Sequence, residues 1–269
     1  MKITPIRVAI ASMAFLVAGV LVFDWYRTPD YEDHFYEEKP EGAMTVFLVG
    51  NSHSRVSYVQ QMLERIAHHD DRYPPLWIDG FLPGGATLYQ HVHNDTIQSY
   101  THPGEFDHIV LQGQSLEPLI WPDYYVDSFE TLEAQARDKG ARPILYQTWP
   151  RHPDCDSYHE VFQPPADVAW AHDQKTELAQ RALKNNDAAF APVGPAWESL
   201  RTADEPIDLY MPDHNHANRK GAYLIALILY ATIIDDELPA DPWTPSDLDV
   251  DVTTNLVDHA RTYVPIDRH

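Results

Sequence analysis

Three side chains, Ser52, Asp213 and His216, could together carry out nucleophilic catalysis. A serine hydroxyl becomes an effective nucleophile when a histidine takes its proton and a carboxylate orients that histidine. Asp213 and His216 lie in one short segment, PDHNHAN, so the carboxylate can reach back to one imidazole nitrogen while the other faces outward. Ser52 follows the apolar run VFLV and a glycine, which predicts a serine at the end of a buried strand.

Two further segments could supply the N–H donors that stabilise an oxyanion, which acyl transfer also requires. The sequence PGGATL over 83–88 and the sequence LQGQS over 111–115 each follow an apolar run that predicts a strand. A glycine lets the backbone approach a ligand closely, and the glutamine side chains of the second segment are amide donors. Other polar residues of these segments and of the PDHNHAN loop are expected to line the pocket, namely Asn51, His53, Gln112 and His214.

Most of these residues also have an interpretation that involves no serine nucleophile. Ser52 could cap the helix that follows it, since serine is a favoured N-cap residue. Asn51 could brace the bend as an Asx-type turn, and the glutamines could bond loop backbone. Asp213, His214 and His216 could instead bind a divalent ion, which would predict a metal-dependent hydrolase.

The elements that must position these residues alternate along the chain between short apolar strands and amphipathic helices. This alternation predicts a three-layer α/β/α sandwich with a mainly parallel central sheet. Sites in such sheets lie beyond the carboxyl ends of the strands, where Ser52 is expected. The strands are expected over 44–49, 75–81, 107–112, 142–149 and 188–194, and the helices over 54–69, 127–140, 165–185, about 197–200 and 219–234.

In these motifs the sequence resembles the SGNH hydrolases, also called GDSL-type esterases and lipases. GNSHS matches the family's first block, Gly-Asp-Ser-x-Ser, with Asn51 in place of the aspartate. GGAT matches the glycine of the second block at Gly85, and QGQS replaces the third block, Gly-x-Asn-Asp. DHNHANRKG matches the fifth block, with Asn218 and Gly221 in the family's positions and Ala217 in place of proline.

The resemblance covers roughly residues 44–235 and implies the same flavodoxin-like α/β/α fold. It implies that Ser52 is the nucleophile, that His216 is the base and that Asp213 orients the base. It also implies an oxyanion hole formed by the N–H of Ser52, by Gly85 and by Gln114, which stands where the family has asparagine. The family's chemistry uses no cofactor, and we expect neither a cofactor nor a metal ion.

The amino-acid composition argues against nucleic acid as a partner and against disulfide bonds within the chain. Lys and Arg total 19 against 41 Asp and Glu, a formal charge of −22, so we expect no nucleic-acid binding. The one cysteine, Cys155, excludes an internal disulfide framework. Aspartates flank it and would disfavour a thiolate, so a nucleophilic role for it is not expected.

The N-terminal part differs from the rest of the chain. Lys2 and Arg7 precede an uncharged apolar run over 8–23 and acidic residues follow it, which predicts export of everything downstream. We favour an uncleaved signal anchor over a removed signal peptide, and a buried N-terminal helix is the third possibility. The expected divisions are 1–26 as the signal segment, 27–43 as an acidic linker, 44–235 as the hydrolase-like domain and 236–269 as an acidic, proline-rich extension packed on the domain.

The sequence therefore predicts an exported serine esterase, anchored in a membrane with its domain outside the cytoplasm, or secreted if the segment is cleaved. A small-molecule or glycan ester is the expected substrate, with O-acyl groups of carbohydrates favoured. An acyltransferase would use the same triad. A binding or scaffold domain that has kept the fold without turnover is the non-enzymatic alternative.

Overall fold

A parallel five-stranded sheet forms the centre of the computed structural model, which describes residues 34–162 and 167–263. The strands follow the order β2-β1-β3-β4-β5, and each adjacent pair is parallel. The apolar helix expected before the domain lies outside the described residues. The strands are β1 (Met44–Val49), β2 (Leu76–Phe81), β3 (His108–Gln112), β4 (Arg142–Tyr146) and β5 (Ala189–Ala191).

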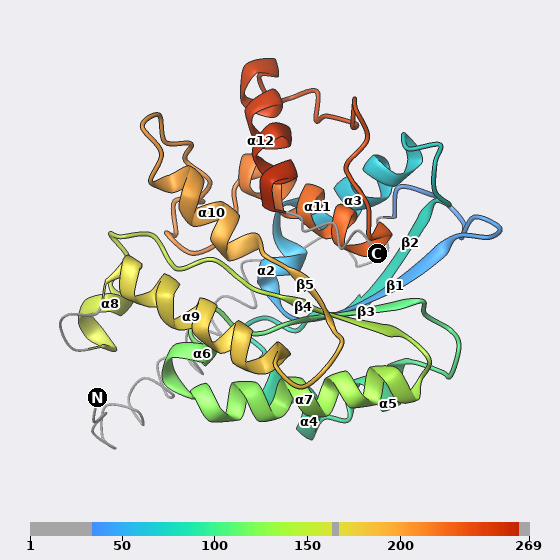
Figure 1. Cartoon of the computed structure of the whole chain (residues 1–269), viewed down its shortest axis with the longest axis horizontal. Coiled ribbons are helices and arrows are strands. Elements are labelled where there is room, and N and C mark those ends of the chain that lie inside the picture. The colour runs from blue at the N-terminus through green and yellow to red at the C-terminus, as the bar shows by residue number, and fades with distance from the viewer. Residues whose placement is uncertain (1–33, 163–166, 264–269) are drawn as a thin grey trace.

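Helices connect the strands and cover both faces of the sheet (Figure 1). The first connection runs through α2 (Ser52–Arg55), a 3₁₀ turn η1 (Val56–Tyr58) and α3 (Val59–His68). The remaining helices are α4 (Leu88–His93), α5 (Thr96–Tyr100), α6 (Glu117–Ile120), α7 (Pro122–Asp138), α8 (Ser157–Glu160), α9 (Val168–Leu183), α10 (Val193–Arg201), α11 (Arg219–Ile234) and α12 (Val250–Tyr263).

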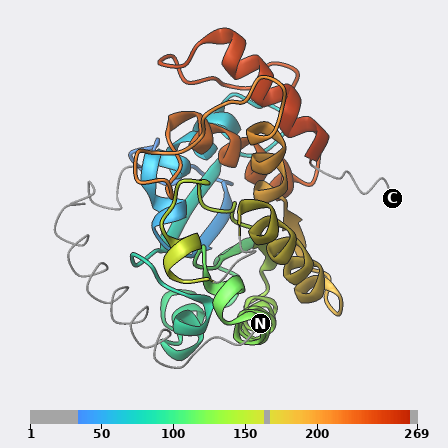
Figure 2. The same ribbon diagram turned by 90° about the vertical axis from the view of Figure 1, so that its left-hand side faces the viewer.

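Two apolar clusters, one on each face, hold the layers together. On one face α3, α10 and α11 pack on the sheet, and α11 is buried along nearly its whole length. On the other face α4, α7 and α9 pack against the opposite sides of the same strands. Figure 2 shows these layers edge-on, with the green helices below the sheet and the orange and red helices above it. The expected three-layer α/β/α architecture is confirmed.

Several element boundaries differ from those expected. The strand expected to reach residue 149 ends at Tyr146, because Gln147 leaves the ladder to pair its backbone with Ala191 and Gly194. The helix expected to start at residue 54 starts at Ser52 and is interrupted at Tyr58, whose φ is +64°. The apolar spacing had not predicted the short helices α4, α5, α6 and α8, because none spans enough turns to show a period.

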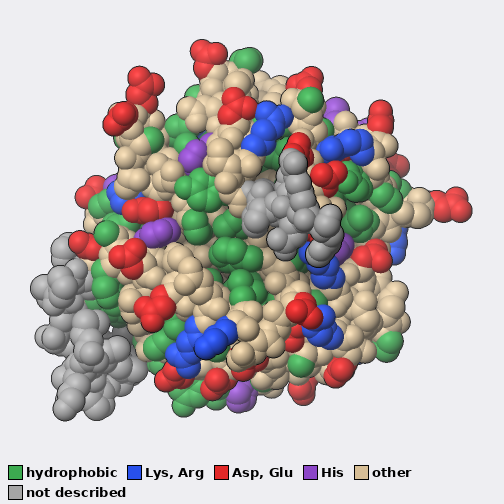
Figure 3. Space-filling view, viewed as in Figure 1, with side chains coloured by type: hydrophobic (Ala, Val, Ile, Leu, Met, Phe, Trp, Pro, Cys, Tyr) green, Lys and Arg blue, Asp and Glu red, His purple; other side chains and the backbone are tan. Residues whose placement is uncertain are grey.

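The C-terminal extension packs on the domain through α12. Leu256, Val257 and Ala260 are buried in the same cluster as α11. Acidic side chains are scattered over the face shown in Figure 3, in keeping with the strongly negative charge. Among the helices that the structure describes, none combines the length and apolar character that crossing a membrane requires.

The first described residues are fastened to the edge of the sheet by a buried carboxylate. Glu64 on α3 accepts hydrogen bonds from His34 Nδ1 at 2.9 Å, from the Phe35 N–H at 2.7 Å and from the Ile78 N–H at 3.3 Å. The His34 ring also stacks on Trp77 of β2, with centroids 3.7 Å apart. Residues 34 and 35, within the predicted acidic linker, are therefore part of the packed structure.

Candidate active site

The bend after β1 is built by Asn51 and leaves Ser52 at the first turn of a helix. Asn51 is the N-cap of α2, and its side-chain oxygen accepts the His53 N–H at 3.0 Å. Its amide nitrogen donates to the carbonyl of Ala86 at 2.8 Å, which ties this bend to the loop after β2. Because Asn51 takes the capping role, the Ser52 hydroxyl is free of it.

Gln112, at the end of β3, supports the same bend through hydrogen bonds of its side chain. Its side-chain oxygen accepts the Asn51 N–H at 3.0 Å and the Ser54 hydroxyl at 3.0 Å, and its amide nitrogen donates to the carbonyl of Gly113. Gly50 is needed here because a Cβ at that position would lie 2.7 Å from the same oxygen. Gln112 and Asn51, both predicted to line the pocket, are buried and hold this bend through their side chains.

Asp213 and His216 face each other within one tight loop before α11. The His216 Nδ1 lies 2.5 Å from Asp213 Oδ2, while the backbone N–H groups of Asn215 and His216 donate to Asp213 Oδ1 at 3.0 and 2.9 Å. Burial raises the pKa of Asp213, but these hydrogen bonds and the His216 charge outweigh it and hold that pKa well below its usual value. Asp213 is therefore an ionised carboxylate near neutral pH.

The second nitrogen of His216 reaches the serine. His216 Nε2 lies 2.8 Å from Ser52 Oγ, although the two residues come from opposite ends of the domain sequence. The Ser52 hydroxyl, the imidazole and the Asp213 carboxylate thus form a continuous hydrogen-bonded relay. This is the arrangement in which a histidine can take the serine proton as the hydroxyl attacks a carbonyl carbon.

Neighbouring elements hold the loop that carries the relay. Trp149 donates its indole N–H to the carbonyl of Asn215 at 3.0 Å, and it stacks on Trp197 with ring centroids 4.1 Å apart. Asn218 caps α11 by accepting the N–H groups of Lys220 and Gly221. These contacts fix the position of His216 relative to the sheet without using its side chain.

The expected oxyanion donors lie on the loops after β2 and β3. Gly85 has a φ of +70°, a backbone conformation that other residues rarely adopt. The Gln114 side-chain oxygen accepts the N–H groups of Leu116 and Glu117 at 2.6 and 3.0 Å. Because that oxygen is occupied, the NH₂ of the same amide is the part of Gln114 that can donate to a ligand.

Solved structures of other proteins align with most of this chain. A protein from Slackia heliotrinireducens assigned as an SGNH hydrolase aligns with 71% of this chain and 99% of its own, at 24% identity and a TM-score of 0.59. A DUF4886 family protein from Bacteroides uniformis aligns with 82% of this chain and 94% of its own, at 16% identity and a TM-score of 0.65. An acetylxylan esterase from Geobacillus stearothermophilus aligns with 73% of this chain and 96% of its own, at 12% identity and a TM-score of 0.52.

This chain has the SGNH-hydrolase fold. No protein-family model matches its sequence, and no curated protein matches it either. The identities to these three structures are 24% or lower, so they establish the arrangement of strands and helices and not the chemistry.

Within the SGNH fold, the other two predicted pocket residues, His53 and His214, contact different neighbours. His53 is buried against Trp149 and His216, with ring centroids 5.0 and 5.1 Å away. Burial, and then the charges of His216 and Lys175, lower the pKa of His53 well below its usual value, so the ring is neutral near pH 7. The His214 ring packs against His152, and among the described residues Asp213, His214 and His216 do not bring their ligand atoms together, so the alternative metal site on these three residues is not supported.

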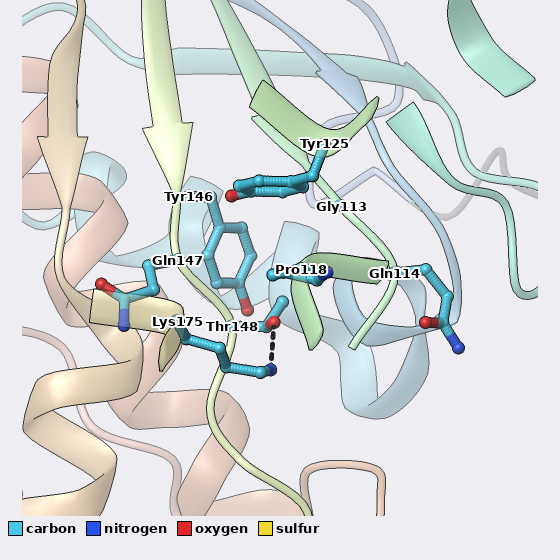
Figure 4. Close-up of a pocket in the computed structure, with 8 residues that line it drawn as sticks. All are labelled: Gly113, Gln114, Pro118, Tyr125, Tyr146, Gln147, Thr148 and Lys175. Atoms are coloured by element: carbon cyan, nitrogen blue, oxygen red, sulfur yellow. Dashed lines mark hydrogen bonds between the residues drawn. The ribbon is translucent and has the colours of Figure 1, made fainter. Parts of the chain in front are cut away.

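A small polar recess lies behind the loop after β3 (Figure 4). Lys175 of α9 extends into it and donates to the Thr148 hydroxyl at 3.0 Å and to the carbonyl of Trp149 at 2.7 Å. Burial, followed by the charge of Arg151, lowers the pKa of this lysine well below its usual value. Gln114 also lines this recess, and its side chain is drawn at the far end from Lys175 in Figure 4, so Lys175 supports the loop bearing Trp149 rather than bonding to the candidate oxyanion donor.

Two positioning residues were not predicted from the sequence. His91 of α4 is buried and contacts the Gly50 carbonyl with Nε2 at 2.8 Å. Glu117 is buried and accepts the N–H groups of Leu88 at 2.9 Å, Tyr89 at 3.2 Å and Gln114 at 3.1 Å. Glu117 therefore joins the start of α4 to the Gln114 loop. The only sequence signal was an acidic residue three positions after Gln114, which does not reveal its partners.

The buried carboxylate of Glu117 makes stability depend on pH. Burial outweighs its three N–H donors and raises the pKa of Glu117 from 4.5 to about 7. Its folded-state pKa exceeds the unfolded value, so its stabilising contribution is complete below pH 4.5 and is lost as pH rises through 7. We expect the free energy of unfolding of the native protein, relative to Glu117→Gln, to fall by on the order of 3 kcal/mol across that range.

Denaturant unfolding of both proteins at several pH values measures this difference. Glu130→Gln on the exposed face of α7 is the matched control and should show no such pH-dependent change. A constant difference between native protein and Glu117→Gln from pH 4.5 to 7.5 would contradict the assignment.

Proposed function

We propose that this protein is a serine esterase that hydrolyses ester bonds through Ser52, His216 and Asp213. The observation that carries the proposal is the continuous relay from Ser52 Oγ to His216 Nε2 at 2.8 Å and from His216 Nδ1 to Asp213 Oδ2 at 2.5 Å. The solved structures that share its fold include proteins described as SGNH hydrolases and esterases, which supports a hydrolase acting on esters.

In the proposed mechanism, Ser52 Oγ attacks the ester carbonyl while His216 Nε2 takes its proton. The carbonyl oxygen becomes an oxyanion, which the N–H of Ser52, the N–H of Gly85 and the amide of Gln114 stabilise. His216 then gives the proton to the leaving alcohol, and an acyl-enzyme remains. Water, activated by His216, attacks the acyl group, and the released proton returns to Ser52 through His216.

O-acyl groups of carbohydrates are the substrate class that we favour. Tyr89 and Tyr124 expose 42% and 58% of their surface, and their rings lie 5.5 Å apart. Exposed aromatic rings offer flat apolar faces, which suit the C–H faces of sugar rings. Tyr89 also lies near the candidate oxyanion loop, because Glu117 binds the backbone N–H groups of both Tyr89 and Gln114. An exported location, predicted from the apolar run at 8–23, would bring the enzyme to acylated glycans.

Active-site titration with a fluorophosphonate tests the proposal. We expect one phosphonyl group per chain, carried on Ser52, and parallel loss of hydrolysis of p-nitrophenyl acetate. Peptide mapping of the labelled protein identifies the modified residue. A folded protein that reacts with neither reagent near neutral pH would refute the esterase and favour the binding-domain alternative.

A further inference from the structure

A second cluster of possible metal-ligating side chains lies next to the relay, because His214 directly follows Asp213 in the chain. Among the described residues, His152, Asp154 and His214 bring three possible metal-ligand atoms within 4.8 Å of one another. The two histidine rings have centroids 4.7 Å apart, and His152 Nδ1 lies 3.6 Å from Asp154 Oδ2. A tetrahedral zinc ion, with bonds of about 2.0–2.1 Å, holds its ligand atoms about 3.3 Å apart.

The backbone positions the two histidines before any ion binds. The His152 N–H donates to the carbonyl of His214 at 2.9 Å, so the loop after β4 and the loop carrying the relay are joined at this point. The His152 ring also packs edge-on against Tyr210, with centroids 5.1 Å apart. His214 has a φ of +60°, in the left-handed region that few residues other than glycine adopt.

The third ligand is adaptable. The Asp154 side chain is 74% exposed, so it can rotate toward a shared ion. Its backbone N–H donates to His152 Nδ1 at 3.1 Å, and an ion bound at that nitrogen would replace this hydrogen bond. To bind an ion, the three ligand atoms have to close from within 4.8 Å of one another to about 3.3 Å.

The donor set selects the kind of ion. Two imidazole nitrogens and one carboxylate, with a fourth position open to water, suit Zn²⁺ and related transition metals. Mg²⁺ and Ca²⁺ prefer oxygen ligands and would bind this set poorly. The strongly negative chain also raises the local concentration of cations.

We propose that His152, Asp154 and His214 bind one Zn²⁺ ion that clamps the loop carrying Asp213 and His216 to the loop after β4. The ion takes no part in ester hydrolysis, because Ser52 and Asp213 already engage the two ring nitrogens of His216. The inference concerns metal binding and loop stability, so it stands apart from the proposed esterase function.

Equilibrium dialysis of the chelator-treated full chain against Zn²⁺, and titration with Co²⁺ as a spectroscopic substitute, test the site. We expect one ion per chain, visible absorption typical of tetrahedral Co²⁺, and a melting temperature that rises with Zn²⁺ concentration. His152→Ala and His214→Gly should each weaken binding at least about 100-fold. The glycine variant removes the imidazole while suiting the left-handed backbone, so loop strain cannot explain its loss of binding.

His93→Ala, at an exposed histidine of α4, is the matched control and should keep native affinity. Saturable binding that survives both His152→Ala and His214→Gly would place the ion elsewhere and overturn the proposal. The absence of saturable binding by the native chain would overturn it as well.

Discussion

Replacing Ser52 by alanine is expected to lower the rate of ester hydrolysis at least about 10³-fold. The reason is that the Oγ lying 2.8 Å from His216 is the only atom removed, and without it no acyl-enzyme can form. The free energy of unfolding should change little, because Asn51 rather than Ser52 caps the helix. Steady-state kinetics with p-nitrophenyl acetate, together with fluorophosphonate labelling, measure the effect.

Ser99→Ala, at an exposed serine of α5, serves as the control and should retain full activity. Native-like turnover or stoichiometric labelling of a folded Ser52→Ala protein would show that another residue is the nucleophile. Binding of an acylated sugar by both proteins, with turnover by neither, would point to a binding domain.

Replacing Asp213 by asparagine is expected to lower kcat by about 10²–10⁴-fold. Two backbone N–H groups, those of Asn215 and His216, donate to Oδ1 and would keep the amide oxygen at that position. The NH₂ group would then face His216 Nδ1, where Oδ2 now lies. The imidazole would have to accept a hydrogen bond there and carry its proton on Nε2, so it could no longer take the proton of Ser52.

The kinetics of Asp213→Asn should show this as a loss in kcat with KM little changed, since the substituted residue does not contact the substrate. Asp208→Asn is a suitable control, because Asp208 accepts a backbone N–H from Tyr210 in the same loop region and has no contact with the imidazole. An Asp213→Asn protein with native kcat would show that the carboxylate does not orient His216.

The features that the sequence predicted are those that local patterns encode. Alternating apolar runs and helices indicated the parallel sheet, and parallel strands place their carboxyl ends at one edge. This brought Ser52 and His216 together despite their separation in the chain. The short range between Asp213 and His216 made their pairing predictable as well, because three residues of one loop can fold back on themselves.

The features that were missed depend on long-range contacts between buried polar groups. Gln112 was expected to line the pocket, and its side-chain oxygen accepts the Asn51 N–H. This contact joins the ends of β1 and β3, so it exists only once the sheet has formed. Glu117 and His91 support loops from other parts of the chain. The local sequence around each of them does not indicate these hydrogen-bond partners. His214 has a left-handed backbone, and its ring packs against His152 from the loop after β4, a contact that the sequence does not reveal.

The hydrogen bonds from His34 and Phe35 to Glu64 limit how far the chain can be shortened at its N-terminal side. A truncation that starts at His34 keeps its stacking on Trp77 and all three donors to the buried carboxylate. A truncation that starts at Met44, the first residue of β1, would remove the two donors from His34 and Phe35. It would also expose the face of Trp77 on which His34 stacks. We therefore expect a shortened chain to keep its native stability only if it begins at or before residue 34.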